Sequence, residues 1–190
     1  MSPPSKHEKD FAAYLKSLID DERRDALAAL RRALGRRPGE VFDPCPYVDP
    51  WLGSEPTRRD EDAHYLVAAL FGLHQGAWQP EGDQRDPTNL GASFARLRAE
   101  VESASVERRF VALLNCHRDD LPDHLRHAIS LLKSKEIPID WAQLLHDVRG
   151  WDRVGRDVQR EWARAFWGRA DGEQVPAGVE GQARDKVNAD

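Results

Sequence analysis

Apolar residues recur every three or four positions along most of this chain, a spacing that places them on one face of an α-helix. The clearest stretch runs from Ser105 to Trp151, where Pro122 and Pro138 separate three segments of helical length. Asp140 precedes the third segment as an N-cap, because its carboxylate can accept amide hydrogens of the first turn. The inward positions are Val106, Phe110, Leu113 and Leu114, then Leu125, Ala128, Ile129 and Leu132, and finally Trp141, Leu144, Leu145 and Val148.

The same spacing predicts further helices at about residues 8–19, 20–35, 62–75, 90–101 and 152–167. Acidic residues open the second of these, where they suit the positive end of the helix dipole, and Gly35 is placed to end it. Thr57 or Asp60 is expected to cap the third, which is strongly apolar. The last helix turns four residues inward: Val154, Val158, Trp162 and Phe166.

Two loops separate these helices. Residues 38–56 are rich in proline and show no helical period, so we expect an ordered loop pinned by Phe42, Tyr47 and Trp51. Residues 75–88 are polar, contain glycine and are a candidate for mobility.

No strand-like alternation of apolar and polar residues appears anywhere in the chain. We therefore predict an all-α fold, a helical bundle of about eight helices. The bundle is expected to form two lobes, residues 1–103 and 104–169, followed by a disordered tail at residues 170–190.

Composition narrows the function classes. No apolar run approaches the roughly 18 residues of a membrane span, and the N-terminus lacks the apolar region of a signal peptide, so we expect a cytoplasmic protein without membrane contact. Cys45 and Cys116 lie far apart and predict free buried thiols. The net charge is −5, of which the tail from residue 170 contributes −3, with five acids against two bases. The remaining body is nearly neutral, so one basic face is compatible with the total.

The sequence contains few signs of a catalytic or metal-binding site. His117, His124 and His127 occur among aspartates, and a small metal-dependent enzyme built on them is one hypothesis. However, no HExxH or EF-hand spacing is present, and the aspartates are better explained as caps for a helix beginning near Leu121. Serine-nucleophile, P-loop and dinucleotide motifs are also missing. We therefore expect no catalysis, no metal and no cofactor.

The arginine pattern is the remaining signal. Arginine and lysine side chains lie beside the apolar stripes of several helices. They form either a solvated face or a surface that binds a phosphate backbone, since the guanidinium group of arginine suits phosphate oxygens. In the last helix a stripe of arginines would lie beside the apolar stripe if that helix were continuous across Gly150 and Gly155. Its members would be Arg149, Arg153, Arg156, Arg160 and Arg164.

The tryptophans could stack on nucleobases, but their helical spacing favours core positions. They are Trp141, Trp151, Trp162 and Trp167.

Six segments, in order, resemble a known family. They are ALRRALGRRP at residues 29–38, HYLVAALFGLH at 64–74, NLGASFARL at 89–97, ERRFVALL at 107–114, LPDHLRHAISLLKSKEIPIDWAQLLHDVRGW at 121–151 and REWARAFW at 160–167. The family is CasB, the small subunit of the type I-E CRISPR Cascade surveillance complex. No single motif is diagnostic, but the similarity spans nearly the whole predicted bundle.

The resemblance implies an all-helical, non-enzymatic subunit present as a pair beside other Cascade subunits. It also implies that basic surfaces hold crRNA and the target and displaced DNA strands without sequence choice, which would stabilise the R-loop. The family's basic positions map onto Arg32, Arg59, Arg108, Arg109, Arg118, Arg126 and Arg153. Lys133 and Arg156 join this candidate nucleic-acid-binding set on their place beside the stripes alone. Arg31 joins it from a cluster at the end of the second helix, Arg31, Arg32, Arg36 and Arg37, which suits either the helix dipole or a bound anion. The acidic tail does not map onto the family pattern.

A competing hypothesis is a structural spacer that docks onto protein partners and contacts nucleic acid little. It draws on the acidic net charge and on the dominance of helix-packing residues. The two hypotheses differ in whether arginine substitutions disrupt strand binding or assembly.

Overall fold

The computed structural model describes residues 2–77, 88–101 and 103–168. Within these ranges the chain forms helices and no strand, so the all-α prediction is confirmed. The α-helices are α1 (Lys6–Asp20), α2 (Arg24–Arg32), α3 (Cys45–Val48), α4 (Arg58–Leu73), α5 (Leu90–Glu100), α6 (Ala104–Asn115), α7 (Leu121–Lys133), α8 (Trp141–Arg149) and α9 (Asp157–Trp167). Two 3-10 turns are η1 (Asp49–Trp51) and η2 (Arg118–Asp120).

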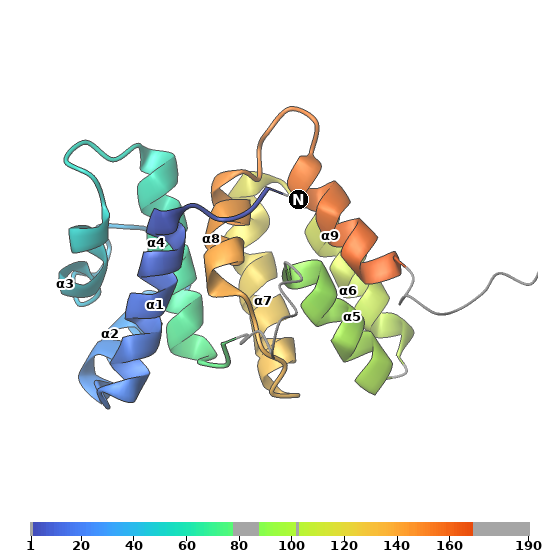
Figure 1. Ribbon diagram of the computed structural model, residues 1–190, viewed down its shortest axis with the longest axis horizontal. Helices are drawn as coiled ribbons and strands as arrows, with labels where there is room; N and C mark the ends of the chain where they lie inside the picture. The colour runs from blue at the N-terminus through green and yellow to red at the C-terminus, as the bar shows by residue number, and fades with distance from the viewer. Residues whose placement is uncertain (1, 78–87, 102, 169–190) are drawn as a thin grey trace, which may run out of the picture.

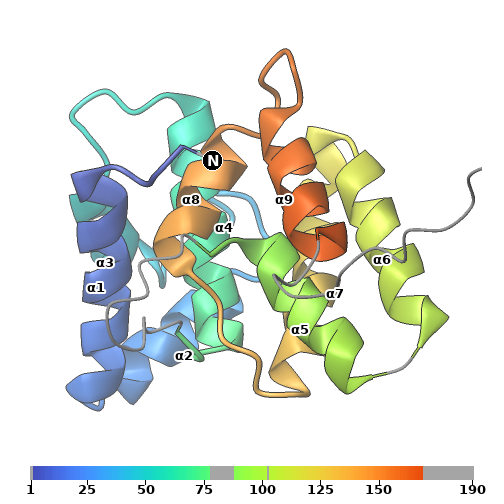
Figure 2. The ribbon, with the colours of Figure 1, turned by 45° about the vertical axis from the view of Figure 1, so that its right-hand side comes forward.

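The helices pack as two groups with α7 and α8 between them (Figure 1). Helices α1 to α4 lie on one side, where α2 packs on α4 and α8 packs on both α1 and α4. Helices α5, α6 and α9 lie on the other, and Figure 2 shows α5 next to α9. Helix α8 thus packs on helices that precede residue 103, and α5 packs on one that follows it. The division into lobes between residues 103 and 104 stays a prediction.

One continuous core fills the space between the helices. All twelve inward positions predicted between residues 105 and 151 are buried, as are Val158, Trp162 and Phe166 of α9. Asp140 caps α8 as predicted, because its side chain accepts a hydrogen bond from the Gln143 amide at 2.9 Å. The helical periodicity of the sequence therefore identified most of the core.

The boundaries of several elements differ from the predictions. Helix α2 begins only at Arg24, because Glu22 adopts a left-handed backbone conformation with φ 53° after α1 ends. Asp120 precedes α7, but its side chain makes no cap hydrogen bond, since its backbone already has helical angles. The proline-rich loop contains α3 and η1, where Trp51 packs on Phe11.

Some predicted core positions are on the surface. Phe42 is 72% exposed and does not pin the proline-rich loop, and Trp167 is 43% exposed. Val154 is 99% exposed because α9 begins only at Asp157. Cys45 and Cys116 are free, as predicted, but half-buried.

Two further predictions concern residues that are not described: the tail and most of the loop at residues 75–88. No helix among the described residues is long and apolar enough to cross a membrane.

A buried carboxylate joins α1 to α8. Glu8 is 2% exposed and accepts hydrogen bonds from the Ser5 amide at 2.6 Å and from Arg149 Nη1 at 2.8 Å. His146 Nδ1 lies 3.2 Å from the same carboxylate, and Arg149 Nε also donates to Asp60 of α4 at 2.7 Å. Burial raises the pKa of Glu8, but the hydrogen bonds from Ser5 and the nearby cations outweigh burial and lower it.

A second buried carboxylate joins α8 to α9. Asp147 is 4% exposed and accepts hydrogen bonds from Trp162 Nε1 at 2.6 Å and from Gln143 Nε2 at 2.8 Å. Burial raises the pKa of Asp147 to about 7, although both hydrogen bonds oppose that shift. The carboxyl is therefore protonated in the folded protein at a pH where it is ionised in the unfolded chain.

Asp147 is expected to make the folded state less stable as pH rises from about 4 to about 7. The folded protein holds this proton more tightly than the unfolded chain does. The contribution of Asp147 to the free energy of unfolding therefore decreases as pH rises through this window, by at most about 4 kcal/mol. Urea unfolding at pH 5 and pH 7.5 measures the slope. Asp147→Asn should flatten it, whereas the exposed Asp119→Asn should not; an unchanged slope in Asp147→Asn contradicts the assignment.

The crossing of α5 and α9 requires a glycine. A Cβ at Gly91 would lie 2.1 Å from the carbonyl oxygen of Trp162, which is backbone and cannot rotate away. Gly91→Ala is expected to destabilise the fold by about 1–3 kcal/mol or more, seen as a lower urea midpoint. Gly53→Ala is the control, since a Cβ there meets nothing within 4 Å. Equal midpoints for the two variants would contradict the close packing.

Candidate nucleic-acid interface

The connection between α8 and α9 breaks the predicted arginine stripe. Gly150 ends α8, Gly155 has φ 157°, and Arg156 is left-handed with φ 52°, so no helix runs continuously through this region. Arg149 is also unavailable as part of a surface stripe, because Glu8 and Asp60 hold its guanidinium. The hypothesis of one continuous stripe is wrong.

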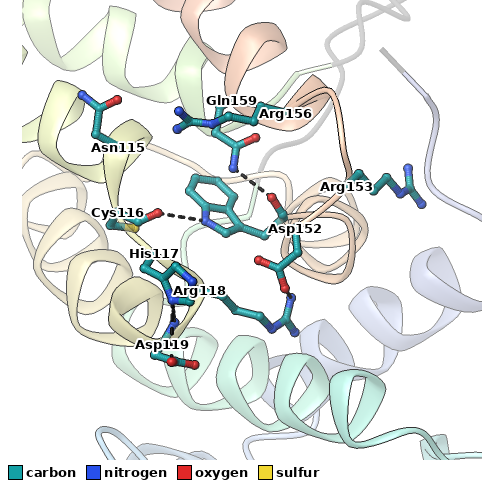
Figure 3. A pocket seen from close by; sticks show the side chains of 10 residues that line it. Asn115, Cys116, His117, Arg118, Asp119, Asp152, Arg153, Arg156 and Gln159 are labelled. Carbon is teal, nitrogen blue, oxygen red and sulfur yellow. Dashed lines mark hydrogen bonds and ion pairs between the residues drawn. The ribbon is translucent and has the colours of Figure 1, made fainter.

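This connection instead forms part of a hollow of about 650 Å³, shown in Figure 3. Three predicted site residues line it, Arg118 from η2 and Arg153 and Arg156 from the connection. The buried indole of Trp151 forms part of its wall and donates to the Cys116 carbonyl at 3.5 Å. The other lining residues are Asn115, Cys116, His117, Asp119, Asp152 and Gln159.

Hydrogen bonds orient two of these arginines. Arg118 Nη1 donates to the Val148 carbonyl at 3.2 Å and lies 3.3 Å from a carboxylate oxygen of Asp152 (Figure 3). Arg156 donates to the carbonyl of Leu114 at the end of α6. Both side chains are therefore positioned before any ligand arrives.

A second hollow of about 560 Å³ lies among the end of α2, the start of α4 and the start of α7. It brings together the predicted residues Arg59, Arg118 and Arg126. Three arginines outside the predicted set also line it, Arg36, Arg37 and Arg58. Its carboxylates are Asp62, Asp119, Asp123 and Asp152.

Asp152 links the two hollows. Its carboxylate lies 3.4 Å from Arg59 and 3.3 Å from Arg118, so two cations share one anion. Because Arg118, Asp119 and Asp152 line both hollows, the two adjoin each other. We call them together the arginine hollows.

Several arginines there have no ion pair with a described residue. They are Arg36, Arg37, Arg126, Arg153 and Arg156. Arg58 is 4.0 Å from Asp62, at the limit of an ion pair. Positive charge therefore exceeds what the neighbouring carboxylates neutralise.

The other predicted site residues line neither hollow. Arg32 at the end of α2 pairs with Asp43, and Arg31 is exposed beside it. Arg108 and Arg109 are exposed on α6. Lys133 is at the end of α7 opposite the hollows.

Arg36, Arg37 and Arg58 are not among the site residues predicted from the sequence. Arg36 follows Gly35, whose left-handed backbone (φ 73°) turns the chain after α2, and Arg58 follows the N-cap Thr57. Their shared signal is a position at a helix terminus. Only packing shows that these termini meet.

The described part of the chain shows neither a cluster of metal-binding side chains nor an activated thiol at Cys116. No group of three or more His, Cys, Asp or Glu residues there could hold a metal ion. His117 is exposed and lies 3.6 Å from Asp119. Burial raises the pKa of Cys116 to about 11, which keeps it a thiol at neutral pH.

Comparison with known proteins places this arrangement in a family. The model for "CRISPR-associated protein Cse2" matches residues 26–167. A CRISPR-associated protein Cse2 from Thermus thermophilus is 41% identical over 146 residues, which is 75% of this chain and 79% of that protein. The chain belongs to the Cse2 family. The predicted resemblance to CasB is confirmed, since solved relatives carry that name.

Solved structures share the fold of this Cse2 family member. CasB from Thermus thermophilus is 37% identical with a TM-score of 0.70, covering 89% of this chain and 100% of that one. M. ruber CasB is 33% identical with a TM-score of 0.72, covering 85% and 93%. A chain from a structure named "CRISPR RNA-guided surveillance complex" is 29% identical with a TM-score of 0.72, covering 85% and 91%.

Proposed function

We propose that this Cse2 family member is a non-catalytic subunit of a type I-E CRISPR Cascade complex. In this role it holds crRNA and the target and displaced DNA strands by their phosphates, and so stabilises the R-loop. Other Cascade subunits and a second copy of the chain are its protein partners. The observation that carries the proposal is the convergence of arginines from α4, α7, η2 and the loops around them on two adjoining hollows.

Phosphate contacts suit this task because they give affinity without sequence choice. The exchange of a DNA duplex for an RNA–DNA heteroduplex is nearly balanced, so a few backbone contacts can tip it. Arg126 and Arg36 approach from different elements, and neither is neutralised by a described carboxylate. A strand crossing the arginine hollows would therefore meet cations on more than one side.

The structural spacer is the second candidate, and one observation favours it. Arg32, Arg59 and Arg118 are partly neutralised by ion pairs within the chain. If most surface arginines served such internal pairs or pairs with protein partners, strands would be held elsewhere in the complex. Direct binding measurements separate the two candidates.

Charge reversal in the second hollow is expected to weaken strand binding. Arg36→Glu with Arg126→Glu should lower affinity for a fluorescent single strand of mixed sequence at least tenfold at low salt. Loss of two phosphate contacts should also reduce the slope of log K against log salt by about 1.4. Fluorescence anisotropy across a salt series measures both quantities.

The control is Arg24→Glu with Arg160→Glu, two exposed positions outside both hollows. It changes net charge equally, so an equal loss in both variants would show a general charge effect. Absence of salt-dependent binding by the unaltered protein would instead support the structural spacer.

Removing the shared carboxylate is expected to strengthen binding. Asp152→Asn frees Arg59 and Arg118 from their common anion, so affinity for the same strand should rise about two- to fivefold at low salt, an effect of less than about 1 kcal/mol. Asp10→Asn on α1 is the control, since among the described residues that carboxylate pairs with Lys6 alone and lies outside both hollows. An equal rise in both variants, or no rise in Asp152→Asn, would show that Asp152 does not compete with phosphate.

A further inference from the structure

The second hollow has an apolar part that phosphate binding does not explain. Leu34 and Leu66 are half-buried, and Pro122 is exposed, so each leaves apolar surface at this hollow. Phosphate oxygens need hydrogen-bond donors and gain nothing from leucine or proline side chains. A ligand that fills the hollow should therefore carry an apolar face as well as negative charge.

Arginine side chains surround this apolar part. Arg126 Nη1 lies 3.4 Å from the position that a Cβ on Gly35 would occupy, so the guanidinium reaches from α7 to the end of α2. Arg58 and Arg59 face the hollow from the start of α4. Planar guanidinium groups stack on aromatic rings as well as binding phosphate, so these side chains suit both parts of a nucleotide.

The volume also suits a group of this size. About 560 Å³ lies within the range of roughly 300–1,000 Å³ typical of small-ligand pockets. A lone phosphate would leave most of this space and the apolar surface to water.

We propose that the second hollow receives one unstacked nucleobase of the bound strand, while the surrounding arginines hold the phosphates on either side. The base contacts Leu34, Leu66 and Pro122 and stacks on a guanidinium plane, as bases do in other single-strand sites. This inference deepens the proposed function and rests on it. Stacking is tolerant of base identity, so the site would add affinity without adding sequence choice.

The carboxylates of the hollow favour a base over an acidic peptide. Asp62 and Asp123 line the same space as the arginines and would repel a carboxylate placed inside the hollow, whereas a nucleobase is uncharged. A nucleobase carries N–H donors that these carboxylates can accept. The mixed lining therefore fits a group that is flat, has N–H donors and is flanked by phosphates.

The test compares a strand that has bases with an abasic strand of the same length and phosphate number. The unaltered full-length protein should bind the strand with bases about tenfold or more tightly at equal salt. A 2-aminopurine placed in the strand should brighten on binding, because its fluorescence is quenched while the base is stacked on its neighbours.

Leu66→Trp fills the hollow without changing charge. It should remove the advantage of the strand with bases, so that the ratio of the affinities for the two strands falls from about ten to about one. Leu131→Trp is the control, a half-buried leucine on α7 outside both hollows. Leu34→Trp fills the hollow from the α2 side and should repeat the result if Leu66→Trp folds poorly.

The outcomes separate this inference from the proposed function. Equal affinity for both strands, or equal behaviour of Leu66→Trp and Leu131→Trp, overturns the nucleobase site while phosphate binding stands. If neither strand binds, the proposed function fails and the nucleobase site fails with it. Competition by an acidic peptide but not by a nucleoside monophosphate would assign the hollow to a protein partner and overturn the inference.

Discussion

The buried carboxylate of Glu8 is the constraint on which the first group of helices depends. A carboxylate that is 2% exposed is costly unless cations and donors surround it, and Arg149, His146 and the Ser5 amide supply them. Arg149 can serve Glu8 and Asp60 together only if α1 and α4 both lie against the end of α8. The placement of these three helices is thereby coupled to one charge.

The end of α8 that Glu8 holds through Arg149 leads directly to the arginine hollows. Arg149 ends α8, and three residues later Asp152 stands between the two hollows with Arg59 of α4 and Arg118 of η2 beside it. The internal network thus holds the chain segment that brings a carboxylate to the arginines. The network that stabilises the fold and the proposed binding surface therefore meet at the same end of α8.

The two classes of arginine in this Cse2 family member have different surroundings. Arg149 is half-buried and pairs with both Glu8 and Asp60, whereas Arg126 and Arg36 are exposed at a hollow with no described ion pair. The periodicity of the sequence placed Arg149 and Arg156 in the same predicted stripe. Residue spacing indicates which face of a helix a residue would occupy, but it does not indicate whether the helix continues. The left-handed backbone at Arg156 ends that continuity.

The sequence by itself determined the helical class, most of the core and caps such as Asp140, because these depend on local spacing and on hydrogen bonds within one turn. Family membership was also readable, since it is spread over six segments in order. Only the tertiary structure decided which arginines meet. Arg36, Arg58 and Arg126 lie far apart in the chain, and their proximity depends on how α2, α4 and α7 pack, an arrangement that no local pattern encodes.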